Sequence, residues 1–240
     1  MRFRFFKPLH GWRALAGEVG IIVLGVLIAL GAQQVAQNIQ ERAEARDASQ
    51  AIRGELEGNM ARLRSRWAVR ACVEKRIYEL QALLDSAGPE GGTIETPSWV
   101  GRPQFWTMQM ARWQASSQAG RAALLSPDDL ALYGSIYSFM ANFNAAMSDE
   151  QRDWARLRTL EHLRRLTPEV TFQLNTTLQE ARYINWRIGV WTIQTASLAD
   201  RLHLKSVRND VPASRSACIP MSTPRDQAVS ESNSAYQKEP

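Results

Sequence analysis

The side chains best suited to catalysis or metal binding are few in this chain, and they form no recognisable site. The three histidines, His10, His162 and His203, lie far apart in the sequence. None belongs to an H-E-x-x-H or C-x-x-C spacing, the patterns that bring two zinc ligands together. The sequence also lacks a G-x-S-x-G elbow and a dinucleotide-binding fingerprint. We therefore predict no catalytic residue, no metal site and no cofactor.

Two cysteines, Cys72 and Cys218, are the remaining reactive side chains, and the sequence allows two interpretations of them. An even pair in an extracytoplasmic domain suggests a disulfide. Such a bond would stabilise the fold by about 5 kcal/mol in the chain-entropy model and would hold the C-terminal segment against the domain. The alternative is two free thiols, with Cys72 buried as a small apolar residue. The choice depends on which side of a membrane the domain occupies.

An apolar run at residues 19–32 is the strongest pattern in the sequence. With its flanks it covers residues 14–35, and about 20 helical residues cross a hydrocarbon core. Nine large aliphatic side chains in the run favour insertion by about 3 to 5 kcal/mol, which exceeds the cost of Glu18 near an interface. We predict a transmembrane anchor, with the lipid bilayer as its partner. Glu18 is then solvated at headgroup depth or paired with Arg13, unless it has a functional role.

The charges beside the anchor indicate its orientation. Basic residues before the span are Arg2, Arg4, Lys7 and Arg13, and those after it are Arg42, Arg46 and Arg53. The positive-inside rule predicts that residues 1–13 are cytoplasmic and that the remaining chain lies in the periplasm of a bacterial cell, as a single-pass inner-membrane protein. A signal peptide cleaved after Gly31 is the alternative, but the leader is long and the helical pattern continues past that point.

The anchor also carries a family pattern. Glu18, Gly25, the run Leu27-Ile28-Ala29-Leu30 and the amides Gln33-Gln34 resemble the N-terminal signature of an uncharacterised bacterial family of single-span proteins, with an E-I-x-L-x-x-x-G-x-L-I-A-L-type anchor. The resemblance covers about 20 residues and implies an anchored helical protein. It implies no activity.

Beyond the anchor, apolar residues recur at steps of three and four, which predicts helices that each bury one face. We expect helices over residues 33–85, 104–125, 126–163 and 168–206, with a partly solvated stalk at 40–50. Ser126-Pro127 and Thr167-Pro168 are typical helix starts. Ser148 could divide the third helix, but the apolar stripe keeps its phase there. The Gly- and Pro-rich residues 86–103 are expected to form a loop and lack the Lys-Ser/Thr pair of a phosphate-binding loop.

The expected fold is therefore all-α: the N-terminal transmembrane helix, then an antiparallel bundle of about four helices over residues 36–206. Residues 207–240 are rich in Ser and poor in large apolar residues, so we expect a flexible or surface-draped tail. A second face formed by Trp106, Met110 and Trp113 is either buried in the bundle or exposed to a partner.

The net charge of +5 does not by itself indicate nucleic-acid binding, because acidic residues are interleaved along the chain. The basic residues between Arg62 and Arg76 surround a helix instead of forming one stripe, and we predict no nucleic-acid partner. The expected function is structural or based on interaction, with a protein partner or a second copy of the chain. The alternatives are a ligand-sensing bundle and an enzyme whose site has no motif. A sensor needs a second span, and its only late candidate, residues 188–193, is too short.

Overall fold

The computed structural model describes residues 12–204 and 214–237, with side chains from 15 to 204 and from 214 to 233. The predicted cytoplasmic residues 1–11, including His10, and the side chain of Arg13 lie outside this part, as do residues 205–213 and 238–240. The described chain is all-α, as predicted. Its helices are α1 Trp12–Ala68, α2 Arg70–Ser86, α3 Ala111–Gln118, α4 Pro127–Leu157, α5 Pro168–Arg201 and α6 Arg225–Gln237, with 3-10 turns η1 Arg121–Leu124, η2 Arg158–His162 and η3 Ser216–Cys218.

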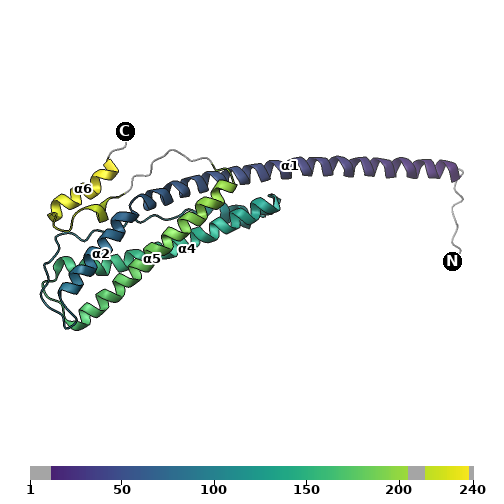
Figure 1. The fold of residues 1–240 in the computed structure, drawn as a ribbon. Coiled ribbons are helices and arrows are strands. Elements are labelled where there is room, and N and C mark those ends of the chain that lie inside the picture. The colour runs from purple at the N-terminus through teal and green to yellow at the C-terminus, as the bar shows by residue number, and fades with distance from the viewer. Residues whose placement is uncertain (1–11, 205–213, 238–240) are drawn as a thin grey trace, which may run out of the picture.

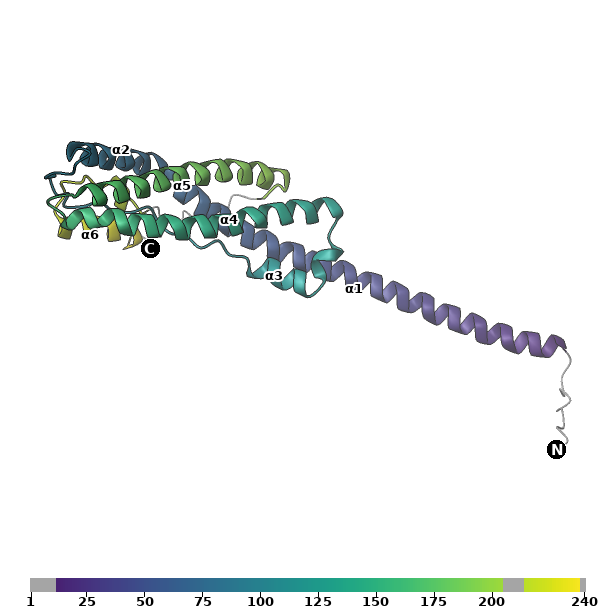
Figure 2. The ribbon, with the colours of Figure 1, turned by 90° about the horizontal axis from the view of Figure 1, so that it is seen from below.

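Helix α1 links the apolar N-terminal segment to the bundle without interruption (Figures 1 and 2). Its 57 residues correspond to a length of about 85 Å at 1.5 Å per residue. The N-terminal half projects from the rest of the molecule (Figure 1). The C-terminal half packs through Ile52, Leu56 and Leu63, none of which is accessible to solvent. The stalk and one wall of the bundle are therefore parts of the same helix.

The predicted continuous helix over residues 33–85 is interrupted at Val69. This residue leaves helical geometry, with φ −100° and ψ 4°, and α2 begins at the next residue. Neither Gly nor Pro marks the position, so local sequence does not predict the break. Beside it, the guanidinium group of Arg70 lies 4.4 Å from the centre of the Trp67 ring. Beyond the break, α2 continues along α5 (Figure 1).

Helices α4 and α5 complete the bundle and begin where the sequence predicts. Ser126 Oγ accepts a hydrogen bond from the Asp129 amide at 3.1 Å, and Thr167 Oγ1 accepts one from the Val170 amide at 3.3 Å. These bonds satisfy amides that the first helical turn leaves unpaired. As expected, α4 continues through Ser148, and it ends at Leu157. Helix α4 runs in the same direction as α1 and α2, and α5 runs antiparallel to these three helices (Figures 1 and 2).

The predicted helix over residues 104–125 is wrong in its first part, because α3 begins only at Ala111. Two amide side chains hold the preceding residues in a non-helical form. Asn59 pairs with the backbone N–H and C=O groups of Gln109 at 2.8 and 2.7 Å, and Asn144 pairs with those of Met108 at 2.7 and 3.1 Å. These long-range bonds replace the bonds that a helix would make.

Of the two expectations for the tail, a flexible segment is wrong for residues 214–237, which form η3 and α6 and lie against the bundle. Ser216, Ala217 and Ile219 are buried against the bundle. A disulfide joins Cys72 on α2 to Cys218, with the two Cα atoms 4.8 Å apart. A segment with few large apolar residues thus becomes ordered because a covalent bond and polar contacts hold it in place.

Candidate functional site

The apolar half of α1 is uncovered. Within the described residues, α1 is the one helix long and apolar enough to cross a membrane; its most apolar 18-residue window has mean hydropathy 2.3, and none of that window is buried. The side chains of Ile21 and Ile28 are 73% and 64% exposed. This is a long apolar N-terminal helix that could be a membrane span.

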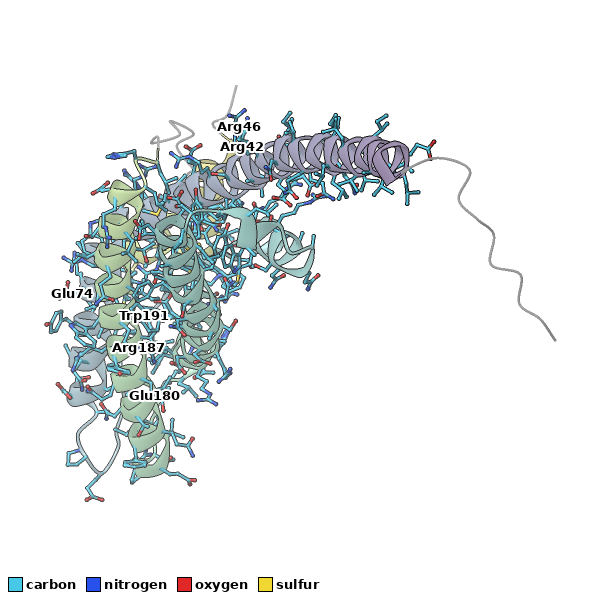
Figure 3. The ribbon with its side chains drawn as sticks, turned by 90° about the vertical axis from the view of Figure 1, so that its right-hand side faces the viewer. Arg42, Arg46, Glu74, Glu180, Arg187 and Trp191 are labelled. Carbon is cyan, nitrogen blue, oxygen red and sulfur yellow. A yellow bond between two sulfur atoms is a disulfide. The ribbon has the colours of Figure 1, made fainter. Side chains whose placement is uncertain are left out.

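The next turns of α1 form a polar stalk. Gln34 donates to Asn38 at 3.2 Å, and Gln40 donates to Glu44 at 3.0 Å. Such pairs four residues apart stabilise a helix that has no partner beside it. Figure 3 shows Arg42 and Arg46 where the stalk reaches the bundle, and buried positions begin at Ala48.

The aromatic face predicted at Trp106, Met110 and Trp113 is packed against the core of the bundle. Trp113 stacks on Tyr137, with ring centres 5.1 Å apart and planes inclined by 8°. The Tyr137 hydroxyl donates to the buried Glu55 carboxylate at 2.6 Å, and burial together with this bond raises the pKa of Tyr137. Glu55 also accepts the Arg112 amide N–H at 2.8 Å. These contacts hold α3 against α1 and α4. Of the two alternatives for this face, packing in the bundle is therefore the one observed.

Three exposed aromatic side chains lie together on α2 and α5. Tyr78, Tyr183 and Trp186 are 62%, 56% and 61% exposed. They line a groove of about 600 Å³ between the end of α1, α2 and α5. We call it the arginine–aromatic groove. Its lining includes Trp67, Arg70, Glu74, Tyr78, Arg182, Tyr183, Asn185, Trp186 and Ile193.

Arginines lie over the aromatic rings of this groove. The guanidinium carbon of Arg70 is 4.4 Å from the centre of the Trp67 ring, and that of Arg182 is 5.7 Å from the Tyr78 ring. At the rim, Arg187 lies 5.4 Å from the Tyr183 ring and 4.4 Å from the Trp191 ring. Figure 3 shows Arg187 and Trp191 together on α5. These cation–π contacts hold the arginine planes in defined orientations.

A buried polar layer lies beneath the groove. Arg66 and Glu150, which are 1% and 0% exposed, form an ion pair at 2.5 Å. Arg66 Nη2 also donates to Asn185 Oδ1 at 3.0 Å. Along α1 and α2, and along α4, the Arg66–Glu150 pair lies between two apolar clusters; the first includes Leu63 and Met147, and the second includes Val73 and Trp154. Asn185 is 7% exposed and lines the groove, so it connects the buried layer to the surface.

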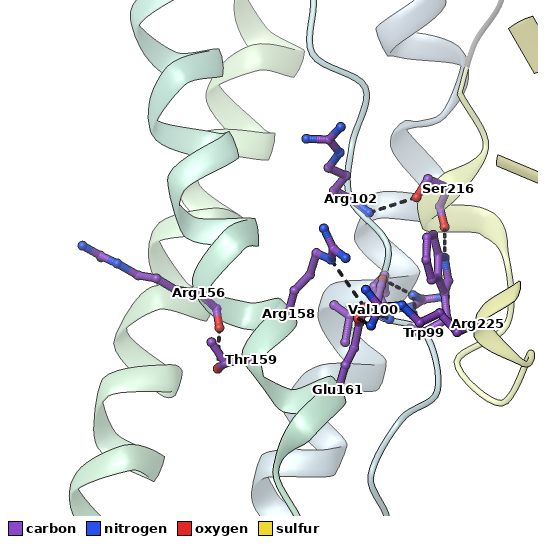
Figure 4. A network of polar contacts seen from close by, with 10 residues as sticks. Trp99, Val100, Arg102, Arg156, Arg158, Thr159, Glu161, Ser216 and Arg225 are labelled. Atoms are coloured by element: carbon purple, nitrogen blue, oxygen red, sulfur yellow. Dashed lines mark hydrogen bonds and ion pairs between the residues drawn. The ribbon is translucent and has the colours of Figure 1, made fainter. Parts of the chain in front are cut away.

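A second polar network fixes the C-terminal segment (Figure 4). Glu161, whose side chain is 2% exposed, accepts from the Val100 amide at 2.9 Å, from Arg158 Nε at 3.4 Å and from Arg225 Nη1 at 3.3 Å. The buried Arg76 donates to the carbonyl oxygens of Val100 and Ile219, and burial lowers the pKa of its guanidinium group.

This network has a structural role. Trp99 Nε1 completes it by donating to the Ser216 carbonyl oxygen at 2.9 Å. The Glu161 carboxylate and the guanidinium groups of the network are paired with each other or with backbone groups. The network thereby holds the loop at residues 97–102 against the segment that begins at Ser214.

The histidines are not brought together. His162 lies at the end of η2, and His203 follows α5 with φ +49°. In the part of the chain that the structure describes, no group of three His, Cys, Asp or Glu side chains is arranged to hold a metal ion.

Fold and site together define a helical protein with one apolar N-terminal helix that could span a membrane and with an open, arginine-bearing groove on its bundle. Comparison with family models, with curated proteins and with solved structures finds no match.

The residues of the groove were not predicted from the sequence. Tyr183, Trp186 and Ile193 lie off the apolar stripe that predicts the buried face of α5. Large apolar side chains on the face of α5 expected to be polar are the signal that could have indicated the groove.

Proposed function

We propose that this protein is a single-pass membrane protein whose helical bundle binds a partner protein at a fixed distance from the bilayer. One observation carries the proposal: the uncovered apolar half of α1 belongs to the same helix as one wall of the bundle. Water-exposed aliphatic side chains are unfavourable over such a length, and a hydrocarbon core removes that cost. The stalk then transmits the position and orientation of the anchor to the bundle.

The proposed location is the bacterial inner membrane, with a cytoplasmic N-terminus and a periplasmic bundle. The basic residues that precede the span support this orientation. The Cys72–Cys218 disulfide is consistent with it, because the periplasm is oxidising and the cytoplasm keeps thiols reduced.

We propose binding and not catalysis because of the side chains that line the open groove. Its polar groups are guanidinium, amide and phenol groups with one carboxylate, Glu74, and it contains no nucleophile paired with a base. Exposed aromatic and arginine side chains are typical of protein interfaces.

Membrane extraction and a reporter fusion test the proposal. We expect the full chain to remain in the membrane pellet at alkaline pH, and alkaline phosphatase fused after residue 206 to be active. Release of a chain shortened by its first 30 or so residues on osmotic shock would contradict the anchor. Fluorescence of a cytoplasmic reporter at the same junction would reverse the orientation.

A further inference from the structure

We propose that the arginine–aromatic groove binds an acidic, amphipathic peptide segment of the partner protein, with carboxylates on Arg70 and Arg182 and apolar side chains along Trp186 and Ile193. This inference rests on the proposed function and names the chemistry of the partner.

The first argument is charge. In the described part of the chain, neither Arg70 nor Arg182 has a carboxylate within 4.0 Å, whereas the buried arginines Arg66 and Arg76 each pair with a glutamate. Arg182 makes one side-chain hydrogen bond, to Gln179 at 3.0 Å. A guanidinium group that lies over a ring keeps most of its N–H edge available, and that edge matches the two oxygens of a carboxylate. The groove thus presents oriented donors without the acceptors that usually accompany them.

The second argument concerns the aromatic rings, which are poorly placed for a different anionic partner. Single-stranded nucleic acid binds by stacking bases on free aromatic faces. Here Trp67 and Tyr78 each have an arginine over one face, and Tyr183 stacks with Trp186 at 5.8 Å. The rings therefore serve to position the arginines and to supply apolar surface. This arrangement favours a peptide over a nucleic acid.

The third argument is the composition of the floor and rim. Asn185 uses its Oδ1 atom to accept from Arg66, and its amide nitrogen has no hydrogen-bond partner among the described residues. That nitrogen is a donor for a peptide carbonyl or carboxylate in the groove. Trp186 and Ile193 are 61% and 60% exposed and offer apolar contact beside it. A segment that alternates acidic and apolar side chains satisfies both sets of groups.

Glu74 provides an internal check, because it is the one carboxylate among the described lining residues. It lies four residues from Arg70 on the same side of the groove. A bound acidic segment must tolerate its negative charge at close range. Neutralising Glu74 should therefore strengthen binding, whereas neutralising the arginines should weaken it.

The experiment selects peptides without assuming their sequence. Full-length protein in phosphatidylcholine nanodiscs, which carry no net charge, is used to select displayed random dodecapeptides. We expect enrichment of Asp and Glu together with aliphatic or aromatic residues. The best peptide is then measured by fluorescence anisotropy against the wild type, Arg70→Gln/Arg182→Gln and Glu74→Gln. The matched control is Arg152→Gln/Arg164→Gln, which removes two exposed arginines outside the groove.

We expect the groove arginine variant to lose at least about 10-fold in affinity, Glu74→Gln to gain about 2- to 5-fold, and the control to stay within about 2-fold of the wild type. Replacing the acids of the peptide by their amides should weaken binding to the wild type by a similar factor. Circular dichroism of each variant establishes that the bundle is folded.

Other outcomes overturn the inference. One is the selection of neutral or basic peptides, or of no peptide. Another is peptide binding that does not depend on the groove arginines. The third is arginine-dependent binding of labelled oligothymidylate that is tighter than binding of the selected peptide. Self-association of the protein that the arginine variant abolishes would assign the groove to a second copy. These outcomes leave the proposed anchor and display function intact, because membrane extraction and the reporter fusion test that function separately.

Discussion

At the scale of single residues, the protonation of Asp153 depends on the fold. It lies on α4 and is 4% exposed. Burial raises the pKa of its carboxyl group to about 6, and the charge of Glu180 on α5 adds to this effect; Arg156, 4.0 Å away, opposes it. Figure 3 shows where Glu180 lies on α5. A carboxylate held at this site costs stability near neutral pH.

Asp153 should therefore make the folded state less stable as pH rises. The native state binds this proton more tightly than the unfolded chain, whose carboxyl has an ordinary pKa of 3.8. The contribution is fully present below about pH 4 and is lost as pH rises through 6. One pKa unit corresponds to about 1.4 kcal/mol, so the loss amounts to about 3 kcal/mol at most.

Asp153→Asn should remove most of this dependence and stabilise the bundle at pH 7.5 by about 1 to 2 kcal/mol. Urea denaturation followed by circular dichroism, at pH values from 4.5 to 7.5, measures both effects. Asp200→Asn, at an exposed position on α5, is the control. A variant that keeps the wild-type pH slope would show that another group causes it.

At the scale of elements, Gly101 determines whether the loop and the C-terminal segment can pack together. Its φ is +69°, and a Cβ atom built there would lie 2.4 Å from the Ser216 carbonyl oxygen. An alanine would thus be strained and would also push the segment away. Gly88 has nearly the same φ, +72°, but a Cβ atom there meets nothing within 4 Å. Comparing an alanine at Gly101 with an alanine at Gly88 therefore separates the effect of backbone strain from the effect of lost packing.

We expect Gly101→Ala to loosen the C-terminal segment and Gly88→Ala to leave it in place. Both should lose about 1 kcal/mol or more from the positive φ. Only Gly101→Ala should speed tryptic cleavage at the exposed Arg215 and Arg225, by about 10-fold, because the clamp around Trp99 and Ser216 no longer closes. Equal cleavage rates in the two variants would mean that the disulfide, and not this packing, holds the segment.

The elements that the sequence predicts well are those set by local chemistry. Ser126 and Thr167 cap helices because each hydroxyl accepts a hydrogen bond from an amide three residues ahead. Such a short-range pattern can be recognised in the sequence. The helix expected over residues 104–110 does not form because Asn59 and Asn144, which bond the backbone there, are 50 and 36 residues away from their partners. The break at Val69 has no local marker either. Periodicity thus indicates which face is buried, but it does not show where tertiary contacts replace a helix.

At the scale of the whole molecule, the groove escapes prediction because it combines elements distant in the sequence, Tyr78 on α2 with Arg182 on α5. The Cys72–Cys218 disulfide was one of the two interpretations that the sequence allowed, because two cysteines leave only one possible pairing. The apolar span is different, because its composition alone indicates a helix that can cross a membrane. The helical pattern continues past the span in the sequence, and the structure shows that α1 joins the span to the bundle without interruption.

That continuity leads to a mechanical prediction. If α1 is one rigid rod, spin labels at Asn38 on the stalk and Asp128 at the start of α4, both exposed, should give a single narrow distance distribution in nanodiscs. The native cysteines are joined to each other, so added cysteines can be labelled selectively. Replacing Arg42-Ala43 by Gly-Pro should broaden the distribution, because Pro removes a helical hydrogen bond and Gly adds backbone freedom.

Ala-Ala at the same two positions is the control and should leave the distribution narrow, because alanine favours the helix. A bundle held by a rigid rod presents its groove at a constant height above the bilayer. It can then meet only partners whose acidic segment reaches that height. A wild-type distribution as broad as that of the Gly-Pro variant would mean that the stalk bends freely, and the groove would then be accessible over a range of distances from the membrane.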